Sequence, residues 1–583
     1  MTKVKIVCTI GPACSNYETL SAMAKAGMNV ARLNFSHGAY DGHQKMLELV
    51  RRVEKDLNTP IAALLDTKGP EIRTGKVEGG TVALEQESLL VLTTEEIVGT
   101  SSRVFMNYPQ LAREVAVGQE IFIDDGTLHL KVEEIRGGDV ACRVIVGGLL
   151  ADTKGINIPG AELSLPALSE KDIEDIKWGV QHEMEYIAVS FVKNRRDIME
   201  VRRIMEEFGE PMKVIAKIET RQAVQNIEEI VEVVDGMMIA RGDLGVEIPT
   251  EDVPLQQKRI IDICRAKGKA VIVATQMLDS MIRNPRPTRA EASDVANAVL
   301  DGADAVMLSG ETAKGAYPLR SVETMKRIVA RAESEIELWE RPLHAVSTTM
   351  GVPDAVSSAA VLIARQMKAS AIVSMTKSGS TAQMVSKHRP PCTILGATPS
   401  QRTWRELSLY WGVLPLMKEE MTDQNTAVDS VLGSCVASGH IREGDLVVVT
   451  AGVPLGTAGT TNLVQVHIAG KILLKGLSLL KREARGAVCV ARSASEAREK
   501  MTKGAVLVAR NTDKEYLPAM RLASAVVVEE GGLTSHTAIV ALELGIPCIV
   551  SAEGALSLLS DGMLVTVDGY RGILYHGRVK LTA

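Results

Sequence analysis

The sequence predicts an α/β protein whose largest part is an eight-stranded parallel (β/α)8 barrel, or TIM barrel. Three observations predict it: eight short apolar runs alternate with helical segments, a purely β-type region interrupts this alternation once, and a polar residue follows each apolar run. Strands that alternate with helices are typical of a parallel sheet covered by helices. A chain of 583 residues is too long for one hydrophobic core, so we expect three or four domains.

The eight expected strands are residues 4–10, 29–37, 61–65, 186–191, 213–219, 237–243, 270–276 and 305–311. Between the first two, Ser15 or Asn16 is a plausible helix N-cap and Gly27 a helix stop. A second helix is expected over 41–56, and Ser169 followed by Asp172 marks a later helix start. The series closes with a helix over 319–340, which gives the strand and helix count of a closed barrel.

Four domains follow from the changes of pattern along the chain. The barrel is expected over 1–69 and 166–342. Short alternating runs with glycine turns predict an inserted β-barrel domain over 70–165. Because this insert leaves after the third strand, from the end where barrel active sites lie, we expect it to act as a lid. A second α/β domain is expected over 343–472 and a C-terminal domain over 473–583.

Composition excludes several classes of partner. A net charge of -6 argues against a general nucleic-acid or membrane-surface binder, and 3% aromatic residues argue against base-stacking platforms. Eight scattered cysteines without a Cys-x-x-Cys pair indicate neither a zinc site nor a disulfide framework. The N-terminus lacks the pattern of a signal peptide, and glycines break the uncharged stretch 446–470. We therefore expect a cytoplasmic protein without a membrane segment.

Charged residues gather where the fifth and sixth strands end. Lys217 and Glu219 are two residues apart and share a strand face, and Asp243 follows the next strand. Two carboxylates suit a hard divalent ion, and a lysine beside them suits a phosphate; a buried ion pair inside the barrel is the alternative. The ends of all eight strands are polar, however, which favours an active site: Thr9, Asn34 and Ser36, Asp66 and Thr67, Ser190, Lys217 and Glu219, Arg241 and Asp243, Thr275, and Ser309.

Two motifs lie outside the barrel. Residues 376–381 carry small hydroxyls, a glycine and a lysine between a strand and a helix, which predicts either an anion cradle or an ordinary capped turn. In the last domain, Gly532 to Ala538 includes His536 next to Ser535, at an expected helix start that would favour a phosphate.

Eight motifs in order resemble pyruvate kinase over residues 1 to about 470: Thr9–Pro12, Arg32–His37, Asp66–Arg73, Lys154–Gly160, Ile215–Glu219, Ala240–Gly245, Ala274–Leu278 and Met307–Thr312. The resemblance implies phosphoryl transfer from phosphoenolpyruvate to ADP, giving pyruvate and ATP in glycolysis. It also implies a homotetramer.

The resemblance assigns roles to the barrel residues. Glu219 and Asp243 resemble the ligands of Mg²⁺ (or Mn²⁺), Lys217 and Arg32 resemble the groups that hold the phosphoryl group, and Gly242, Asp243 and Thr275 resemble the substrate carboxylate pocket. Thr275 and Ser309 resemble parts of the water network that protonates enolpyruvate. Asn34, Ser36, Asp66 and Thr67 resemble a K⁺ site, and Glu71 is similar to the glutamate of K⁺-dependent members. Arg73 and Lys154 resemble nucleotide contacts, with Thr9, Pro12, Asn34 and His37 as weaker candidates.

The resemblance also covers the regions after the barrel. Thr376, Lys377, Ser378 and Thr381 would hold an effector phosphate, with Gly459 and Thr460 in the loop that closes on it. Because that loop has no Trp or Arg, unlike fructose-bisphosphate-activated members, we expect a sugar monophosphate or AMP.

The last domain resembles the extra C-terminal domain of some bacterial pyruvate kinases, which is similar to the mobile phosphohistidine domain of PEP-utilising dikinases. No separate ATP-grasp domain is present in the sequence, so we expect a non-catalytic His536 and a structural or docking role. A dikinase-like enzyme with His536 as phosphocarrier, or an inactive metabolite sensor, are the alternatives.

Overall fold

The computed structural model describes residues 2–161, 163–335, 351–419, 424–454, 459–470, 472–577 and 579. These residues form two compact units. The first contains the described residues up to 335 together with Lys377–Arg389 and Thr398–Met417. The second contains Gly351–Thr376, Pro390–Ala397 and the described residues from Lys418 onward.

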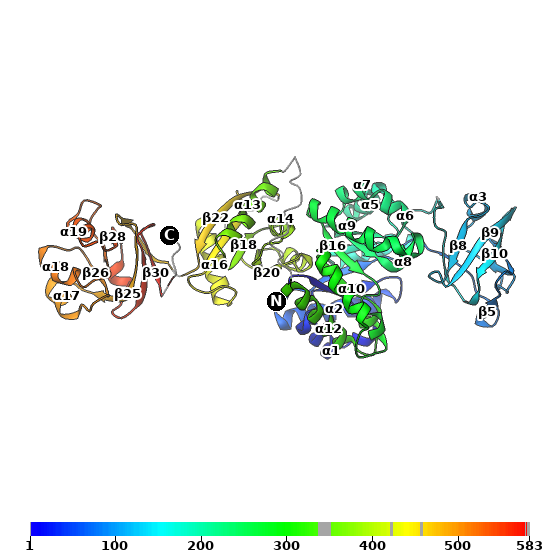
Figure 1. Ribbon diagram of the computed structural model, residues 1–583, viewed down its shortest axis with the longest axis horizontal. Helices are drawn as coiled ribbons and strands as arrows, with labels where there is room; N and C mark the ends of the chain where they lie inside the picture. The colour runs from blue at the N-terminus through cyan, green and yellow to red at the C-terminus, as the bar shows by residue number, and fades with distance from the viewer. Residues whose placement is uncertain are drawn as a thin grey trace. The chain divides into compact units, whose positions relative to one another are not determined.

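The first unit is built on a closed parallel barrel in the order β1-β17-β16-β15-β14-β13-β3-β2 (Figure 1), so the predicted fold class is confirmed. Its strands are β1 (Lys5–Thr9), β2 (Val30–Asn34), β3 (Ala62–Asp66), β13 (Tyr186–Val189), β14 (Lys213–Ile218), β15 (Gly236–Ala240), β16 (Ala270–Ala274) and β17 (Ala305–Leu308). Nearly every strand residue is buried, because the helices cover the outer face and side chains fill the interior.

The helices around the barrel follow the predicted rhythm. They are α1 (Tyr17–Ala26), α2 (Tyr40–Leu57), α4 (Glu170–Gln181), α5 (Arg195–Phe208), α6 (Arg221–Gln225), α7 (Ile227–Val233), α8 (Arg241–Glu247), α9 (Val253–Lys267), α10 (Arg289–Asp301), α11 (Gly310–Ala313) and α12 (Pro318–Glu335), with 3-10 turns at Pro12–Cys14, Thr250–Asp252 and Asp279–Ile282. Asn16 caps α1 through a bond from the Thr19 amide, and Gly27 ends it with φ 132°. Of the two N-cap candidates, Asn16 is therefore the cap, and the predicted helix stop at Gly27 is confirmed.

Two local features of the structure differ from a simple alternation of one strand and one helix. The segment over 223–234 forms two short helices divided at Asn226, whose amide side chain donates to the Lys193 carbonyl 2.9 Å away. The sixth strand stops at Ala240, and Arg241 already begins α8. Asp243 therefore stands in the first turn of a helix and not on a strand.

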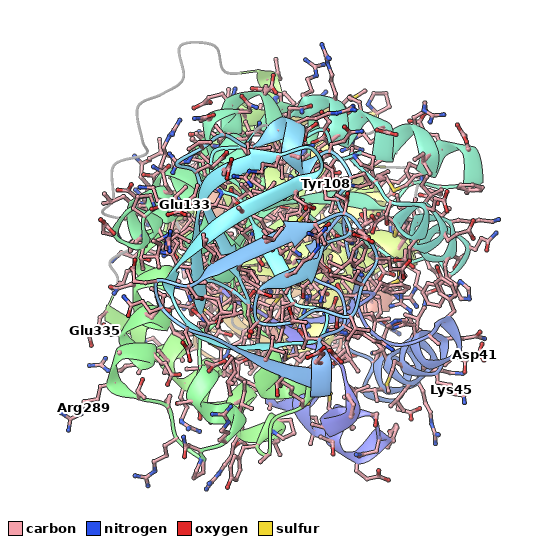
Figure 2. The ribbon with its side chains drawn as sticks, turned by 90° about the vertical axis from the view of Figure 1, so that its right-hand side faces the viewer. Asp41, Lys45, Tyr108, Glu133, Arg289 and Glu335 are labelled. Carbon is pink, nitrogen blue, oxygen red and sulfur yellow. The ribbon has the colours of Figure 1, made fainter. Side chains whose placement is uncertain are left out.

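The insert is a β body joined to the barrel by two linkers, and its sheet faces the viewer in Figure 2. Its elements are β4 (Ile72–Arg73), β5 (Thr81–Leu84), β6 (Leu89–Thr93), β7 (Arg103–Phe105), α3 (Leu111–Glu114), β8 (Glu120–Ile123), β9 (Leu128–Arg136), β10 (Asp139–Val146), β11 (Gly148–Ala151) and β12 (Gly155–Asn157), with a 3-10 turn at Glu78–Gly80. Seven strands pair in the order β4-β12-β8-β9-β10-β6-β7, and a bridge between Thr74 and Met106 links the two ends. The aliphatic core of this body is its own.

Four elements that follow the barrel in sequence belong to the first unit: α14 (Ser380–Lys387), α15 (Gln401–Glu406), a 3-10 turn (Leu407–Leu409) and β20 (Val413–Met417). They are anchored by buried charges. Arg405 pairs with Glu54 at 2.7 Å and with Glu185 at 3.4 Å, and Arg389 pairs with Asp304 at 2.8 Å. Such paired charges are costly to separate once buried.

The second unit contains two sheets. In the first, β18 (Ala371–Met375) lies between β19 (Thr393–Thr398) and β21 (Leu446–Gly452), and β22 (Thr461–Ile468) runs antiparallel to β21; α13 (Val352–Gln366) and α16 (Gln424–Ala437) accompany it. The second has the order β23-β30-β29-β25-β26-β27-β28-β24. Its elements are β23 (Ile472–Lys475), β24 (Leu477–Ser478), β25 (Glu483–Val490), α17 (Ala494–Lys500), β26 (Val506–Ala509), a 3-10 turn (Lys514–Tyr516), α18 (Leu517–Met520), β27 (Ala525–Val528), α19 (His536–Leu544), β28 (Cys548–Val550), α20 (Ala555–Leu558), β29 (Leu564–Asp568) and β30 (Ile573–His576).

No helix among the described residues is long and apolar enough to cross a membrane. The boundaries of the four predicted domains stay predictions.

Candidate active site

At the carboxyl end of β14, the Lys217 ammonium group is paired with two carboxylates. Lys217 Nζ lies 2.8 Å from Glu219 Oε1 and 3.2 Å from Asp66 Oδ1, and donates to Ser190 Oγ at 2.7 Å. The spacing of two residues puts Lys217 and Glu219 on one face, as the strand period requires. The lysine side chain is only 12% exposed, so its charge is held in a low-dielectric environment by three neighbouring strands.

Asp66, at the end of β3, joins the lysine to Arg32 on β2. Arg32 Nε lies 2.6 Å from Asp66 Oδ2, and its Nη1 donates to Thr9 Oγ1 at 2.9 Å. Asp66 Oδ1 faces Lys217 but accepts no well-directed hydrogen bond. Two cations and a shared carboxylate thus lie side by side, which is an arrangement suited to the oxygens of a phosphate.

The pKa values follow from this clustering. Burial by itself would lower the pKa of Lys217, but the carboxylates of Asp66, Glu219 and Asp243 raise it above its usual value. Burial would raise the pKa of Asp66, but Arg32 and Lys217 outweigh it and lower that pKa. The lysine is therefore a fixed cation and Asp66 a fixed anion at neutral pH.

Asp243 behaves differently because it faces another acid. Burial first, and the nearby Glu219 carboxylate second, raise the pKa of Asp243 to about 7. The two carboxylates lie within hydrogen-bonding reach of each other, and Glu219 Oε2 accepts from the Phe191 amide at 2.7 Å. The carboxylate oxygens of Glu219 and Asp243 repel each other at this distance. A hard divalent cation such as Mg²⁺ would relieve this repulsion, and such ions prefer oxygen ligands. Sequence spacing predicted this pair.

The ends of β15 and β16 are joined by Thr275. Its Oγ1 accepts from the Gly242 amide at 2.8 Å and donates to the Ala274 carbonyl at 2.7 Å. Thr275 has φ 67° and Gln276 has φ 55°, a strained conformation for residues other than glycine. A Cβ at Gly242 would find its nearest neighbour, Thr275 Oγ1, at 3.5 Å. The glycine therefore leaves space for a substrate group next to Asp243.

Several contacts of this mouth were not predicted from the sequence. Ser190 was recognised as polar but received no role, although its Oγ donates to the Thr67 carbonyl at 2.7 Å while it accepts from Lys217. Buried Glu311 accepts from the amides of Ser309 and Leu278, and so holds the predicted Ser309 in place. Ser190 and Glu311 each follow a barrel strand. This position after a strand was the only feature of the sequence that could have indicated a role in the site.

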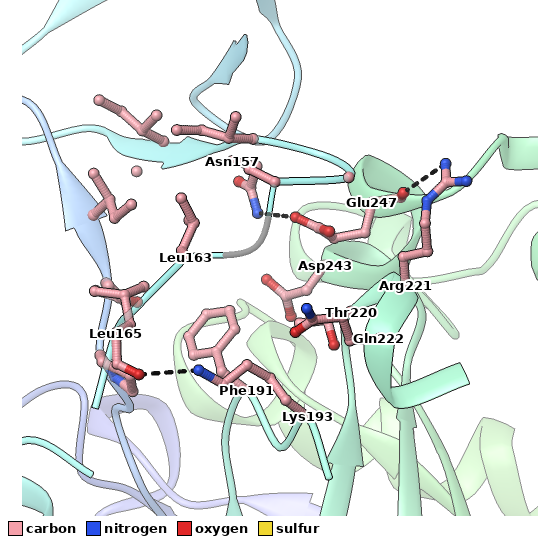
Figure 3. Close-up of a pocket in the computed structure, with 18 of the residues that line it drawn as sticks. Asn157, Leu163, Leu165, Phe191, Lys193, Thr220, Arg221, Gln222, Asp243 and Glu247 are labelled. Carbon is pink, nitrogen blue, oxygen red and sulfur yellow. Dashed lines mark hydrogen bonds between the residues drawn. The ribbon is translucent and has the colours of Figure 1, made fainter. Parts of the chain in front are cut away.

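A cleft of about 440 Å³ lies between the insert and the barrel mouth, within the size range of small-molecule sites. Arg73, Lys154 and Glu71 line it from the insert side and Asp243 from the barrel side. Figure 3 shows Asp243 and Phe191 within it, and the 3.5 Å contact from Asn157 Nδ2 to Glu247 Oε1 that spans it. Arg73 Nε is paired with Glu71 at 2.6 Å and Lys154 Nζ with Asp124 at 2.9 Å. The weaker nucleotide candidates Thr9, Pro12, Asn34 and His37 are not among its lining residues.

Comparison with known proteins identifies the family. The model of the pyruvate kinase barrel domain matches residues 1–322, that of the pyruvate kinase alpha/beta domain matches 354–467, and that of the PEP-utilising enzyme mobile domain matches 501–572. The chain belongs to the pyruvate kinase family. It is 46% identical to the pyruvate kinase of Geobacillus stearothermophilus over 99% of both chains, and 45% identical to that of Bacillus licheniformis over the full length of both. The resemblance seen in the sequence is confirmed, including that of the C-terminal domain.

The residues predicted to bind K⁺ lie at the ends of β2 and β3. Asn34 and Asp66 are paired across the two strands, and Asn34 Oδ1 accepts from the Ser36 amide at 3.1 Å. Thr67 Oγ1 accepts from the Ser190 amide at 3.1 Å. The structure brings these oxygens to one edge of the mouth, and their role stays a prediction.

The predicted effector residues are divided between the units. Lys377, Ser378 and Thr381 belong to the first unit, where the Lys377 carbonyl accepts from Thr403 Oγ1 at 2.8 Å. Thr376, Gly459 and Thr460 belong to the second, and residues 456–458 of the predicted loop lie outside the described residues. Their role stays a prediction.

His536 is the first residue of α19, and Ser535 caps that helix by accepting from the Ala538 amide. The histidine Nδ1 atom is buried without a hydrogen-bond partner among the described residues. The family match places this segment within a PEP-utilising mobile domain, and it assigns no role to the histidine here.

Proposed function

We propose that this chain transfers the phosphoryl group of phosphoenolpyruvate to ADP at the carboxyl end of the barrel. The observation that carries the proposal is the buried Lys217 ammonium, held by Asp66, Glu219 and Ser190 beside a second cation, Arg32. The bond between phosphorus and the enol oxygen breaks as a terminal oxygen of ADP bonds to phosphorus. The enolate that remains takes up a proton at its methylene carbon, giving pyruvate.

Each side chain has a part in this transfer. Lys217 and Arg32 hold phosphoryl oxygens and are already oriented by Asp66, so little reorganisation is needed as charge develops. Gly242, Asp243 and Thr275 form the pocket for the substrate carboxylate, with room left by the missing side chain of Gly242. Thr275 and Ser309 orient the water that delivers the proton. Glu219 and Asp243 would hold Mg²⁺ or Mn²⁺, which supplies electrostatic stabilisation of the enolate oxygen when bound.

The nucleotide enters the cleft between the barrel and the insert. Arg73 and Lys154 are available there to contact ADP phosphates once their present carboxylate partners, Glu71 and Asp124, are exchanged for the ligand. We propose that the insert closes on the bound nucleotide as a lid, which would exclude water from the transferring group.

Further parts of the proposal rest on the sequence. We propose a K⁺ requirement through Asn34, Ser36, Asp66 and Thr67, with Glu71 supporting it. We also propose activation by a sugar monophosphate or AMP, a homotetramer and a cytoplasmic location. A panel of these phosphates tests the activation: a leftward shift of the phosphoenolpyruvate saturation curve supports it, and an unchanged curve with every compound refutes it.

The activity is tested by coupling pyruvate formation to lactate dehydrogenase, with and without K⁺ and Mg²⁺, and by measuring ATP in parallel. The proposal requires one ATP for each pyruvate, and loss of turnover without the divalent ion. A dikinase-like reaction would instead consume or produce AMP and inorganic phosphate or pyrophosphate, and a metabolite sensor would show no turnover.

A further inference from the structure

The second unit contains a cavity of about 640 Å³ that plays no part in the proposed reaction. One wall is α16 with β22, and the opposite wall is β23 with the segment that enters and forms β30. This volume is within the range of small-molecule sites and would accommodate a molecule of amino-acid size or somewhat larger.

A glycine opens the cavity from the α16 side. Gly433 stands inside that helix, where glycine costs about 1 kcal/mol of stability relative to alanine. A Cβ added at Gly433 would have no atom within 4 Å, so crowding does not explain the glycine. Gly433 lines the cavity, so a larger side chain at this position would reduce the space at the α16 wall.

Apolar side chains form part of the inner surface of the cavity. Leu432 on α16, Ile468 at the end of β22 and Tyr575 on β30 are 6%, 6% and 3% exposed, respectively, and Ile472 and Ile573 extend this surface. Ile472 and Ile573 are half-buried, so covering the surface that they still expose favours a ligand with an apolar body.

Charges of both signs stand around this apolar surface. Lys475 on β23 and Arg571 before β30 are cationic, whereas Asp429 on α16 and Glu443 before β21 are anionic. Burial lowers the pKa of His467, so its imidazole is neutral at pH 7 and adds no charge. The lining residues themselves carry two positive and two negative charges, and Arg571 Nη1 also lies 3.5 Å from Asp568 Oδ2.

The charges on opposite walls are near one another. Asp429, Arg571 and Lys475 all act electrostatically on His467, and Asp429 and Arg571 both act on Tyr575. A ligand with an ammonium group and a carboxylate could meet Asp429 and Arg571 at once while its body covers the apolar surface. We propose that this cavity binds a large apolar α-amino acid, as a zwitterion.

The test uses the full-length protein and three probes that share one ring system: L-tryptophan, indole-3-propionate without the ammonium group, and tryptamine without the carboxylate. Isothermal titration calorimetry should show binding of L-tryptophan, with each analogue at least tenfold weaker. Equal binding of either analogue, or no binding of L-tryptophan at millimolar concentration, overturns the proposal.

Two charge variants assign the contacts. Asp429→Asn should weaken L-tryptophan at least fivefold and remove its advantage over indole-3-propionate, because the ammonium partner is lost. Arg571→Gln should likewise remove its advantage over tryptamine. If neither variant changes the order of the three probes, the zwitterion is not recognised by these charges and the assignment is wrong.

Gly433→Leu locates the ligand. It narrows the cavity at the α16 wall and improves helix propensity, so we expect L-tryptophan binding to weaken at least tenfold while the melting temperature is kept or raised. The matched control is Gly42→Leu, at another helical glycine whose Cβ would have no atom within 4 Å. It should leave binding unchanged. Unchanged binding in Gly433→Leu would place the ligand elsewhere and refute the proposal, whatever the fate of the proposed reaction.

Discussion

The barrel mouth and the turn before α19 each present a side chain that phosphoryl chemistry can use, but they surround it differently. Lys217 follows a buried strand and has Glu219 at 2.8 Å, Asp66 at 3.2 Å and Ser190 at 2.7 Å. His536 follows the buried strand β27 by a few residues, and its Nδ1 atom accepts or donates no hydrogen bond among the described residues. A reactive residue type is common to both regions, and only the barrel mouth fixes its charge and direction.

This difference shows that a preorganised site is recognised by the side chains that contact the reactive residue, more than by the type of that residue. Taking an ammonium group out of water is costly, and the three acids near Lys217 offset this cost so fully that its pKa rises. The ammonium group is thereby fixed at the place where a phosphoryl group would develop negative charge. The predictions below test whether the two regions differ in function as they differ in surroundings.

The largest effect is expected for Lys217→Met. It removes the charge that is aimed at the transferring group and leaves the side-chain volume nearly unchanged, so kcat should fall by about 10³ or more. Steady-state rates at saturating phosphoenolpyruvate and ADP measure this. Lys45→Met, on the exposed face of α2, is the control and should keep wild-type kcat. Near-normal kcat in the Lys217 variant would show that the barrel mouth is no more important for turnover than the turn before α19. It would refute the proposed mechanism.

A smaller loss is expected for Glu219→Gln, about 10² in kcat, because one of two negative charges available to the divalent ion is removed. The glutamine oxygen can still accept from the Phe191 amide, so the fold of the mouth should persist. Manganese binding followed by electron paramagnetic resonance should weaken by at least tenfold. Unchanged manganese affinity would show that the ion is held by other residues.

An effect on nucleotide use is expected for Asp172→Ala. Asp172 is fully buried, and its carboxylate accepts from the Gly69 amide at 2.9 Å and from the Ser169 amide at 2.8 Å. Gly69 lies where the chain passes from the barrel into the insert, and Ser169 lies where the chain returns to the barrel. Without the carboxylate, both linkers loosen, so KM for ADP should rise about fivefold to tenfold, with a stability loss of about 1–3 kcal/mol.

Glu291→Ala is the matched control for that variant. Glu291 fills the same position of a capping box at the start of α10, away from the linkers of the insert. It should lower the melting temperature by a similar amount and leave KM for ADP unchanged. If both variants change KM equally, Asp172 acts only through stability and not through the lid.

The smallest effect is expected for His536→Ala, which should keep kcat within about twofold of wild type. Among the described residues, the His536 Nδ1 atom has no hydrogen-bond partner that would orient it for transfer. The coupled assay measures kcat, and mass spectrometry under alkaline conditions searches for phosphohistidine during turnover. A tenfold loss of kcat together with phosphate on His536 would make the C-terminal domain part of the reaction.

The sequence was informative where function depends on neighbours along the chain or on strand ends. The spacing of Lys217 and Glu219 placed both on one face, and the polar strand ends placed Asp66 and Thr275 at the same mouth. Contacts that join distant segments could not be predicted in this way: Asp172 meets Gly69 across 103 positions, and Glu311 meets Leu278 across 33. Nor did hydrophobic periodicity reveal that α8 begins at Arg241, because polar residues after a strand are equally typical of a loop.

The predictions for the effector residues and the domain boundaries were the least determined by the sequence. The turn at 376–381 has the hydroxyls and the lysine of an anion cradle, but an ordinary helix start uses the same residue types. Segments 377–389 and 398–417 belong to the compact unit that contains the barrel, although they follow it in sequence. Long-range packing decides such membership, and local sequence patterns carry little information about it.

The most direct test of the central claim is the position of Mn²⁺ in crystals of the full-length chain, located by anomalous diffraction with phosphoenolpyruvate present. The account predicts one strong peak between the carboxylates of Glu219 and Asp243, with Lys217 on the same side. A peak bound by other residues, or ligand density in which the phosphate lies away from Lys217 and Arg32, would contradict it.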